Sequence, residues 1–315
     1  MSLKNLIDIF KGEMDNKKIK SMAFVSEEER QRVIMESKRV YLPQINLEFS
    51  KAHRGYKPGF THLILSSTGS GKSTLTRTIL FEALKNYRVF WYSTEETFEE
   101  FREYCANSGI PNELLKNLFF KRECDEESII DVAARVSVEN SCDLFIFDNY
   151  TTCKEVTKLK QDGQIDIFKK IRNLMLELNM PLIVVAHTSS DAKAFKVEKR
   201  DPFEVRGFKD IAMESHVIYS LETFNIEVKK KLNIGFDRNE ESEERFYYET
   251  EKISLLNIIK SRNNGDGKNY LLTYNHKSGF YSNVQEIEDR ELYCFKHKGL
   301  MYSKGKFEQD KEESK

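Results

Sequence analysis

A run of small residues that ends in a lysine and two hydroxyl residues has the most specific chemistry in the sequence. Glycines let backbone N–H groups curl around an anion, and a lysine at this spacing reaches the outer phosphates of a nucleotide. The pattern therefore predicts a phosphate-binding loop for ATP. The residues expected to contact the nucleotide are Ser67, Thr68, Gly69, Ser70, Gly71, Lys72, Ser73 and Thr74.

The residues on either side of this loop support the same interpretation. The apolar run Leu63–Leu65 predicts a strand before the loop, and Leu75, Ile79 and Leu84 have the spacing of a helix after it. A helix that begins at the loop adds unpaired N–H donors and the positive end of its dipole to the anion site. One residue departs from the usual pattern, because Ser66 stands where such loops begin with glycine.

Polar residues that follow other apolar runs add further chemistry. Asp148 ends one run and, together with Ser73, is an expected ligand of Mg²⁺. Glu95 follows another run and is the candidate general base that polarises a water for attack on the γ-phosphate, with Glu96 as the alternative. His187 follows a third run, and we expect it to contact the γ-phosphate or the attacking water.

Predicted strands and helices alternate along the chain, and these elements have to position the polar residues. The strands are continuous apolar runs, which is typical of a parallel sheet covered on both faces. Ligands of such sheets bind beyond the carboxyl ends of the strands, so the loop and the polar residues should share one rim. Strands are expected at 62–65, 88–93, 118–120, 143–147, 182–186 and 216–221, with a hairpin-like pair at 253–259 and 269–274.

The composition narrows the class of protein. Charged residues make up 32% of the 315 residues and the formal net charge is −1, so local loops rather than a basic coat would bind nucleic acid. No apolar run approaches the ~18 residues that span a membrane, and a secretion signal is missing. The five cysteines show no metal-binding spacing. We therefore expect a cytoplasmic protein without a membrane partner.

The order of the motifs resembles the ATPase domain of the DnaB-type hexameric replicative helicases. Five motifs occur in that family's order, and the resemblance covers about 45–281. The strand that ends at Glu95 is similar to the family's Ser-x-Glu motif, and Lys260-Ser261-Arg262-Asn263 resembles its Lys-x-Arg-Asn motif. The other matching segments are Leu144–Tyr150, Pro181–Thr188 and 204–218.

This resemblance implies a fold and an assembly. The fold would be a RecA-like P-loop ATPase core of the α/β class, with a mostly parallel sheet flanked by helices and antiparallel C-terminal strands. The assembly would be a homo-oligomeric ring, taken as a hexamer, with ATP between subunits. Arg262 would then be an arginine finger supplied to the neighbouring subunit, with Lys260 contacting the γ-phosphate beside it. An apolar stripe between Leu3 and Phe10 would dock on the next subunit.

The resemblance also implies that two loops facing the centre of the ring grip single-stranded DNA. One loop follows Asp148 and the other follows His187. Lysines without stacking aromatic residues favour backbone contacts with little sequence preference. The residues expected to contact DNA are Lys154, Lys158, Lys160, Lys193, Lys196, Lys199, Arg200 and Arg206. A primase or polymerase of the replisome would be a further partner.

The expected division of the chain is a linker and docking segment at 1–44, the ATPase domain at 45–285 and a polar tail at 286–315. This scheme lacks the family's primase-contacting N-terminal domain, which favours a phage-like form. The expected function is an ATP-dependent DNA helicase or translocase in phage or mobile-element replication. Two other functions stay open: a RecA-like recombination-mediator or clock-type ATPase, and an ATP-gated helicase loader or scaffold that does not unwind DNA.

Overall fold

The structure is a computed structural model. Its described residues are 55–66, 68–124, 126–187, 209–231, 246–262, 267–275, 277–287, 301–303 and 306–308, together with Ser26, Glu28 and Ala52. The apolar stripe between Leu3 and Phe10 lies outside these residues. Within them, no helix combines the length and the apolar content needed to cross a bilayer.

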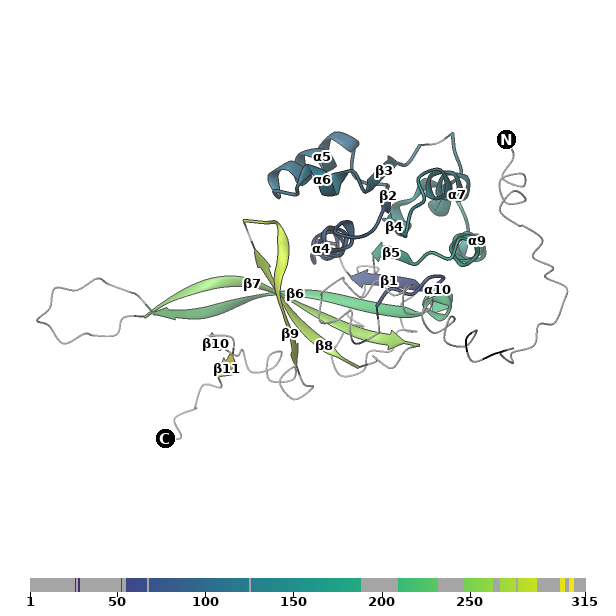
Figure 1. The fold of residues 1–315 in the computed structure, drawn as a ribbon. Helices are drawn as coiled ribbons and strands as arrows, with labels where there is room; N and C mark the ends of the chain where they lie inside the picture. The colour runs from purple at the N-terminus through teal and green to yellow at the C-terminus, as the bar shows by residue number, and fades with distance from the viewer. Residues whose placement is uncertain are drawn as a thin grey trace, which may run out of the picture.

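One mixed sheet runs through the described part of the chain, in the order β3-β2-β4-β5-β1-β6-β7-β8-β9 (Figure 1). The strands from β3 to β6 in this order are parallel, and β7, β8 and β9 continue the sheet antiparallel. The strands are β1 (Thr61–Ser66), β2 (Val89–Ser93), β3 (Leu118–Arg122), β4 (Leu144–Asp148), β5 (Leu182–His187), β6 (Val217–Lys231), β7 (Phe246–Ser261), β8 (Asn269–Asn275) and β9 (Phe280–Ile287), with a separate pair of β10 (Met301–Ser303) and β11 (Lys306–Glu308).

Helices connect the parallel strands and begin where the sequence supplies caps. Thr97 and Glu100 form a reciprocal capping box at the start of α5, and the Ser128 hydroxyl caps α7. The helices are α4 (Lys72–Leu84), α5 (Phe98–Asn107), α6 (Asn112–Leu115), α7 (Ile129–Glu139), α8 (Lys154–Thr157), α9 (Gln161–Glu177) and α10 (Lys209–Glu214), with a 3-10 turn η1 (Tyr150–Thr152).

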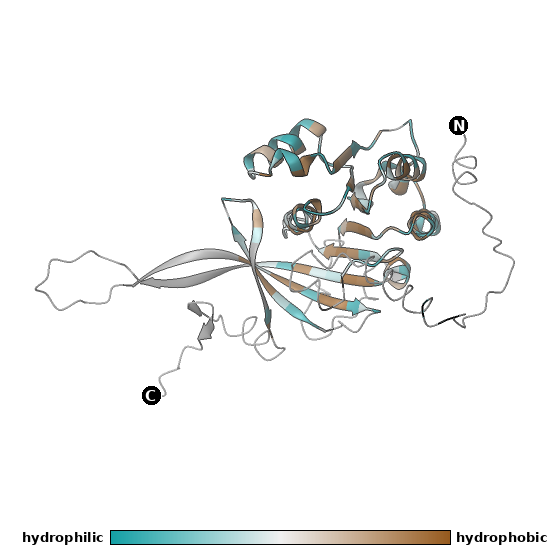
Figure 2. Cartoon of the chain, viewed as in Figure 1, coloured by the Kyte–Doolittle hydropathy of each residue, from teal (hydrophilic) through white to brown (hydrophobic). Residues whose placement is uncertain are grey.

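Two apolar cores cover the two faces of the sheet. Alternate residues of a strand enter different cores: on β1, Ile64 packs with α4, whereas Leu63 and Leu65 pack on the face that α7 and α9 cover. Figure 2 shows apolar residues along the strands and along the helices beside them. Burial on both faces explains why the strands were visible in the sequence as continuous apolar runs.

The strand order places the loop between β1 and α4 at the centre of the sheet. From β1 the chain crosses to β2, which lies beyond β5 and β4, and it later returns to place β6 on the other side of β1. Such a switch in strand order leaves a crevice at the carboxyl ends of the strands. Glu95, Asp148 and His187 all lie at that edge, as the sequence predicted.

Strands β6 and β7 are longer than the sequence predicted. We expected strands at 216–221 and 253–259, but β6 and β7 pair continuously from Val217 opposite Ser261 to Lys231 opposite Phe246. From Asn225 and Lys252 outward these two strands pair with each other and with no other strand of the sheet. We call this part the ribbon. It extends beyond the carboxyl edge of β1, where Figure 1 shows it as a two-stranded arm.

Candidate nucleotide site

The phosphate loop has the backbone that an anion cradle needs. Gly69 and Gly71 have φ angles of +78° and +88°, in the left-handed region that favours glycine, and α4 begins directly after Gly71. The Ser66 hydroxyl lies 2.5 Å from the Ser70 hydroxyl, so the serine that replaces the usual glycine closes the loop. Ser67 lies outside the described residues. The loop therefore offers backbone N–H groups at a helix N-terminus.

Lys72 is held at the bottom of this loop. It is only 5% exposed, and its ammonium group donates a hydrogen bond to the Ser66 carbonyl at 3.1 Å. Burial lowers the pKa of Lys72 to about 8, while the negative charges of Asp148 and Glu95 act in the opposite direction. The lysine and both carboxylates lie at the same edge of the sheet, just beyond the carboxyl ends of β1, β4 and β2.

Asp148, at the end of β4, is a buried carboxylate that forms no ion pair with any residue that the structure describes. It is 5% exposed, and among the described residues no N–H or O–H group donates to its side chain. Burial, followed by the charges of Glu95 and Glu96, raises the pKa of Asp148 to about 7. A cation would relieve this repulsion, and oxygen ligands are those that Mg²⁺ prefers. Asp148 and the half-buried Ser73 therefore fit a magnesium site.

Glu95 faces the site from the end of β2 and lies within a polar network. Its Oε1 atom is 3.2 Å from Nε2 of His187, and it accepts hydrogen bonds from Asn149 at 3.4 Å and Thr152 at 3.3 Å. The side chain is 44% exposed, so water can reach it. The backbone N–H of His187 donates to Thr151 Oγ1 at 3.0 Å, which joins β5 to the turn after Asp148.

Glu96 is directed to a different partner. Its carboxylate forms an ion pair with Arg77 of α4. The Arg77 guanidinium in turn lies 3.9 Å from the centre of the Tyr104 ring. The sequence predicted either Glu95 or Glu96 as the base, and in this geometry Glu95 contacts His187 whereas Glu96 pairs with Arg77, which lies between α4 and α5.

Comparison with known proteins gives the fold. No protein-family model and no curated protein matches the sequence. Among solved structures, the chain is similar to a KaiC-like protein of the hyperthermophilic archaeon Pyrococcus horikoshii OT3, with a TM-score of 0.54. The match covers 79% of this chain and 99% of that protein at 14% identity. The fold is RecA-like. Identity at this level establishes the architecture and leaves the activity to be argued from the site.

Lys260 and Arg262 lie at the opposite edge of the RecA-like sheet from the phosphate loop. β7 runs antiparallel to β6, so its C-terminal end meets the beginning of β6. There the Lys260 ammonium donates to the Ala212 carbonyl at 2.7 Å, and Arg262 donates to the Met213 carbonyl at 3.2 Å. The Arg262 N–H also donates to the carbonyl of His216, beside the first residue of β1. These side chains cannot reach the phosphate loop of their own chain.

The lysines expected to contact DNA divide into two groups. Lys154, Lys158 and Lys160 are exposed, but the segment after Asp148 is folded as η1, α8 and the start of α9 rather than as the expected loop. The other group belongs to the loop after His187, which lies outside the described residues. It contains Lys193, Lys196, Lys199, Arg200 and Arg206.

Sequence reasoning missed a chain of hydroxyl groups beneath the phosphate loop. Thr223 of β6 donates to the Ser70 carbonyl at 2.7 Å and lies 2.9 Å from the Ser254 hydroxyl. Ser254 is 2.8 Å from the Tyr281 hydroxyl, which lies directly against Gly71. A side chain at Gly71 would collide with that hydroxyl. No local pattern could reveal this chain, because its members come from three strands that are distant in the sequence.

Proposed function

We propose that this protein is an ATP hydrolase whose complete site forms between neighbouring copies, and that it uses hydrolysis to move along single-stranded DNA. The observation that carries the proposal is the division of charged groups between two edges of one sheet. Lys72, Asp148 and Glu95 lie at the carboxyl edge, and Lys260 and Arg262 lie at the other. A site divided in this way is completed by a head-to-tail neighbour.

The residues at the carboxyl edge support hydrolysis of the terminal phosphate. The loop N–H groups and Lys72 would hold and neutralise the phosphates. Glu95 would orient a water and accept its proton, because it is the exposed carboxylate of the site and is fixed by His187 and Asn149. Asp148 and Ser73 would hold Mg²⁺, which supplies charge neutralisation at the phosphate oxygens.

The position of Arg262 supports a site shared between subunits. β1 has six residues, so at roughly 3.3 Å per residue its two ends lie about 16 Å apart. Arg262 is beside the first end and the phosphate loop is at the second. A neighbour that presents its Arg262 edge to this loop would supply the missing positive charge. Such a residue accelerates phosphoryl transfer about 10³–10⁵-fold.

The DNA part of the proposal depends on the motif order and on the exposed lysines after Asp148. A backbone-directed contact needs positive side chains that reach solvent, and Lys154, Lys158 and Lys160 are all exposed. A second candidate is a clock-type or remodelling ATPase that does not unwind DNA. The likeness to a KaiC-like protein supports that candidate equally well.

One set of assays tests the proposal. We expect magnesium-dependent ATP turnover that oligo-dT stimulates, and displacement of the strand of a forked duplex. Lys72→Ala should abolish turnover, whereas the control Lys85→Ala, an exposed lysine at the end of the same helix, should not. Turnover without any response to oligo-dT would refute the DNA proposal and favour remodelling. Turnover that persists in Lys72→Ala would refute the site itself.

A further inference from the structure

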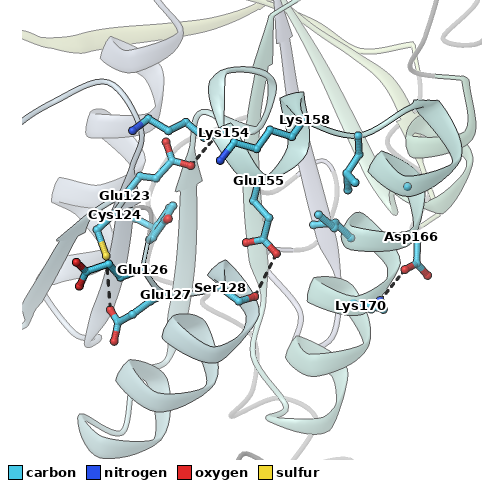
Figure 3. A pocket seen from close by; sticks show the side chains of 14 residues that line it. Glu123, Cys124, Glu126, Glu127, Ser128, Lys154, Glu155, Lys158, Asp166 and Lys170 are labelled. Atoms are coloured by element: carbon cyan, nitrogen blue, oxygen red, sulfur yellow. Dashed lines mark hydrogen bonds and ion pairs between the residues drawn. The ribbon is translucent and has the colours of Figure 1, made fainter.

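A cavity of about 590 Å³ opens beyond the carboxyl ends of β2 and β3, apart from the phosphate loop. It lies between the connection from β3 to α7 and the segment formed by α8 and α9 (Figure 3). In Figure 3, Cys124, Glu126 and Glu127 lie on one side of the cavity, and Asp166 and Lys170 lie on the opposite side. A volume of this size suits a small molecule or one or two side chains of a peptide.

Several of the charged groups around the cavity build its walls. Glu155 accepts the backbone N–H of Ile129 at 2.9 Å and thereby caps α7. Glu123 accepts the backbone N–H of Lys154 at 2.7 Å, which fixes the start of α8. Asp166 pairs with Lys170 at 2.6 Å. Glu123 and Glu155 are thus held in place by backbone groups of the cavity walls.

Two polar groups in the cavity have no partner among the described residues. Tyr92 is 2% exposed and lines the cavity, but its hydroxyl makes no hydrogen bond with them. Burial and the nearby carboxylates Glu123 and Glu155 raise the pKa of Tyr92. The second group is Glu126, an exposed carboxylate without an ion pair in the described part of the chain. The ring of Tyr92 is buried, but its hydroxyl reaches the open space of the cavity, where a ligand atom can form a hydrogen bond with it in place of water.

The charge of the lining selects the ligand. Five carboxylates and three lysines line the cavity; Glu127 is paired with Lys121 and Arg135, so Glu126 is the lining carboxylate left for a ligand. A phosphate group would meet the carboxylates, whereas an ammonium or guanidinium group can donate both to a phenol oxygen and to a carboxylate. The lysines can donate to the backbone carbonyl groups of a peptide, which a simple amine lacks.

An apolar strip crosses the cavity beside these polar groups. Leu159 is 40% exposed, and Ile167 forms part of the lining behind it. Leu159 lies so close to Gly163 that a Cβ atom there would be 3.1 Å from it. The methylene stem of a lysine or arginine packs well on such a strip.

We propose that this cavity binds a basic segment of another protein, with a lysine or arginine side chain inserted beside Tyr92 and Glu126. The cationic group donates to the tyrosine oxygen and to the carboxylate, and its stem lies along Leu159. This site lies on the face of the sheet that α7 and α9 cover, and its occupation requires neither ATP nor DNA. The peptide-binding proposal can therefore be tested independently of the proposed ATP hydrolysis.

The rate at which the Cys124 thiol is alkylated can report whether the cavity is occupied. Cys124 is half-buried and lines the cavity, whereas Cys105, Cys142 and Cys153 are buried. The probe is a blocked peptide of alternating arginine and alanine, with an alternating glutamate and alanine peptide and oligo-dT as comparisons. We expect the arginine peptide, and not the glutamate peptide, to slow alkylation of Cys124 by iodoacetamide, as measured by peptide mass spectrometry, and protection to weaken at high salt. Oligo-dT shows separately whether DNA covers this cavity, because Lys154 and Lys158 also line it.

Two variants test the geometry. Tyr92→Phe should weaken the peptide about fivefold, which is the loss of one hydrogen bond. Glu126→Gln should weaken it about tenfold, because a charge-assisted bond is lost. The control Glu99→Gln, on an exposed position of α5, should leave affinity unchanged. Equal protection in all three variants, no protection by the arginine peptide, or protection by oligo-dT alone would overturn the proposal.

Discussion

The divided site predicts that two inactive variants restore activity when they are mixed. Arg262→Ala leaves the phosphate loop intact, and Lys72→Ala leaves the arginine edge intact. Each variant alone should be strongly impaired, since loss of an arginine finger costs about 10³–10⁵ in rate, or roughly 4–7 kcal/mol of barrier. In a mixed assembly, a loop from the first variant can meet an arginine from the second. Such a site contains every group that hydrolysis needs.

The size of the recovery follows from counting interfaces. In an equal mixture that exchanges subunits, half of the loops and half of the arginines are intact. About one quarter of head-to-tail interfaces therefore combine an intact loop with an intact arginine, and turnover should reach about a quarter of the wild-type value. The assay is steady-state ATP turnover as a function of the mixing ratio, with a maximum at equal amounts.

A matched mixture serves as the control. Lys72→Ala and Glu95→Gln both damage the carboxyl edge, so no interface between them has an intact loop and an intact base in the same chain. This mixture should stay inactive at every ratio. If the Arg262→Ala and Lys72→Ala mixture also stays inactive although exchange of subunits is demonstrated, the shared site is refuted.

Three further predictions concern single residues. Glu95→Gln should lower kcat about 10²–10⁴-fold. Glu96→Gln should mainly lower the melting temperature, because it weakens the ion pair with Arg77 of α4. A large loss of kcat in Glu96→Gln alone would identify Glu96 as the base. Thr223→Val should raise KM for ATP about fivefold, because it removes the hydrogen bond to the Ser70 carbonyl. Thr223→Ser should return KM to the wild-type value, and an unchanged KM in the valine variant would contradict this role. Burial lowers the pKa of His216 from its ordinary 6.5 to about 4. Between these pH values the unfolded state binds a proton at His216 and the folded state does not. The free energy of unfolding should therefore fall by up to about 3 kcal/mol as the pH drops from 6.5 to 4. Denaturant titrations should find a flatter pH dependence in His216→Gln, and an identical dependence would rule out this histidine as the cause.

The carboxyl edge of the sheet was predictable because its determinants are local. The phosphate loop is contiguous, and buried parallel strands are visible as apolar runs whose ends share one edge. From these features the sequence indicated the fold class, and it placed Glu95, Asp148 and His187 together. The roles of these residues remain predictions for the assays above.

Features that depend on distant pairing were not predictable. The outer parts of β6 and β7 are rich in charged residues, and they pair with each other across the segment between Lys231 and Phe246. The difference between Glu95 and Glu96 depends on Arg77, which belongs to another element. Likewise, the unpartnered Tyr92 hydroxyl becomes evident only when α8 and the connection after β3 are placed around it.

The ribbon begins two residues after Thr223, whose hydroxyl holds a carbonyl of the phosphate loop. The Thr223 hydrogen bond, and the Tyr281 hydroxyl that lies against Gly71, therefore join these strands to the cradle. A binder of the ribbon that displaces Thr223 would change the affinity for nucleotide, and reciprocity would then require nucleotide to change the affinity for that binder by the same factor. Titrating a ribbon-directed antibody fragment with and without an ATP analogue would measure this factor without any turnover.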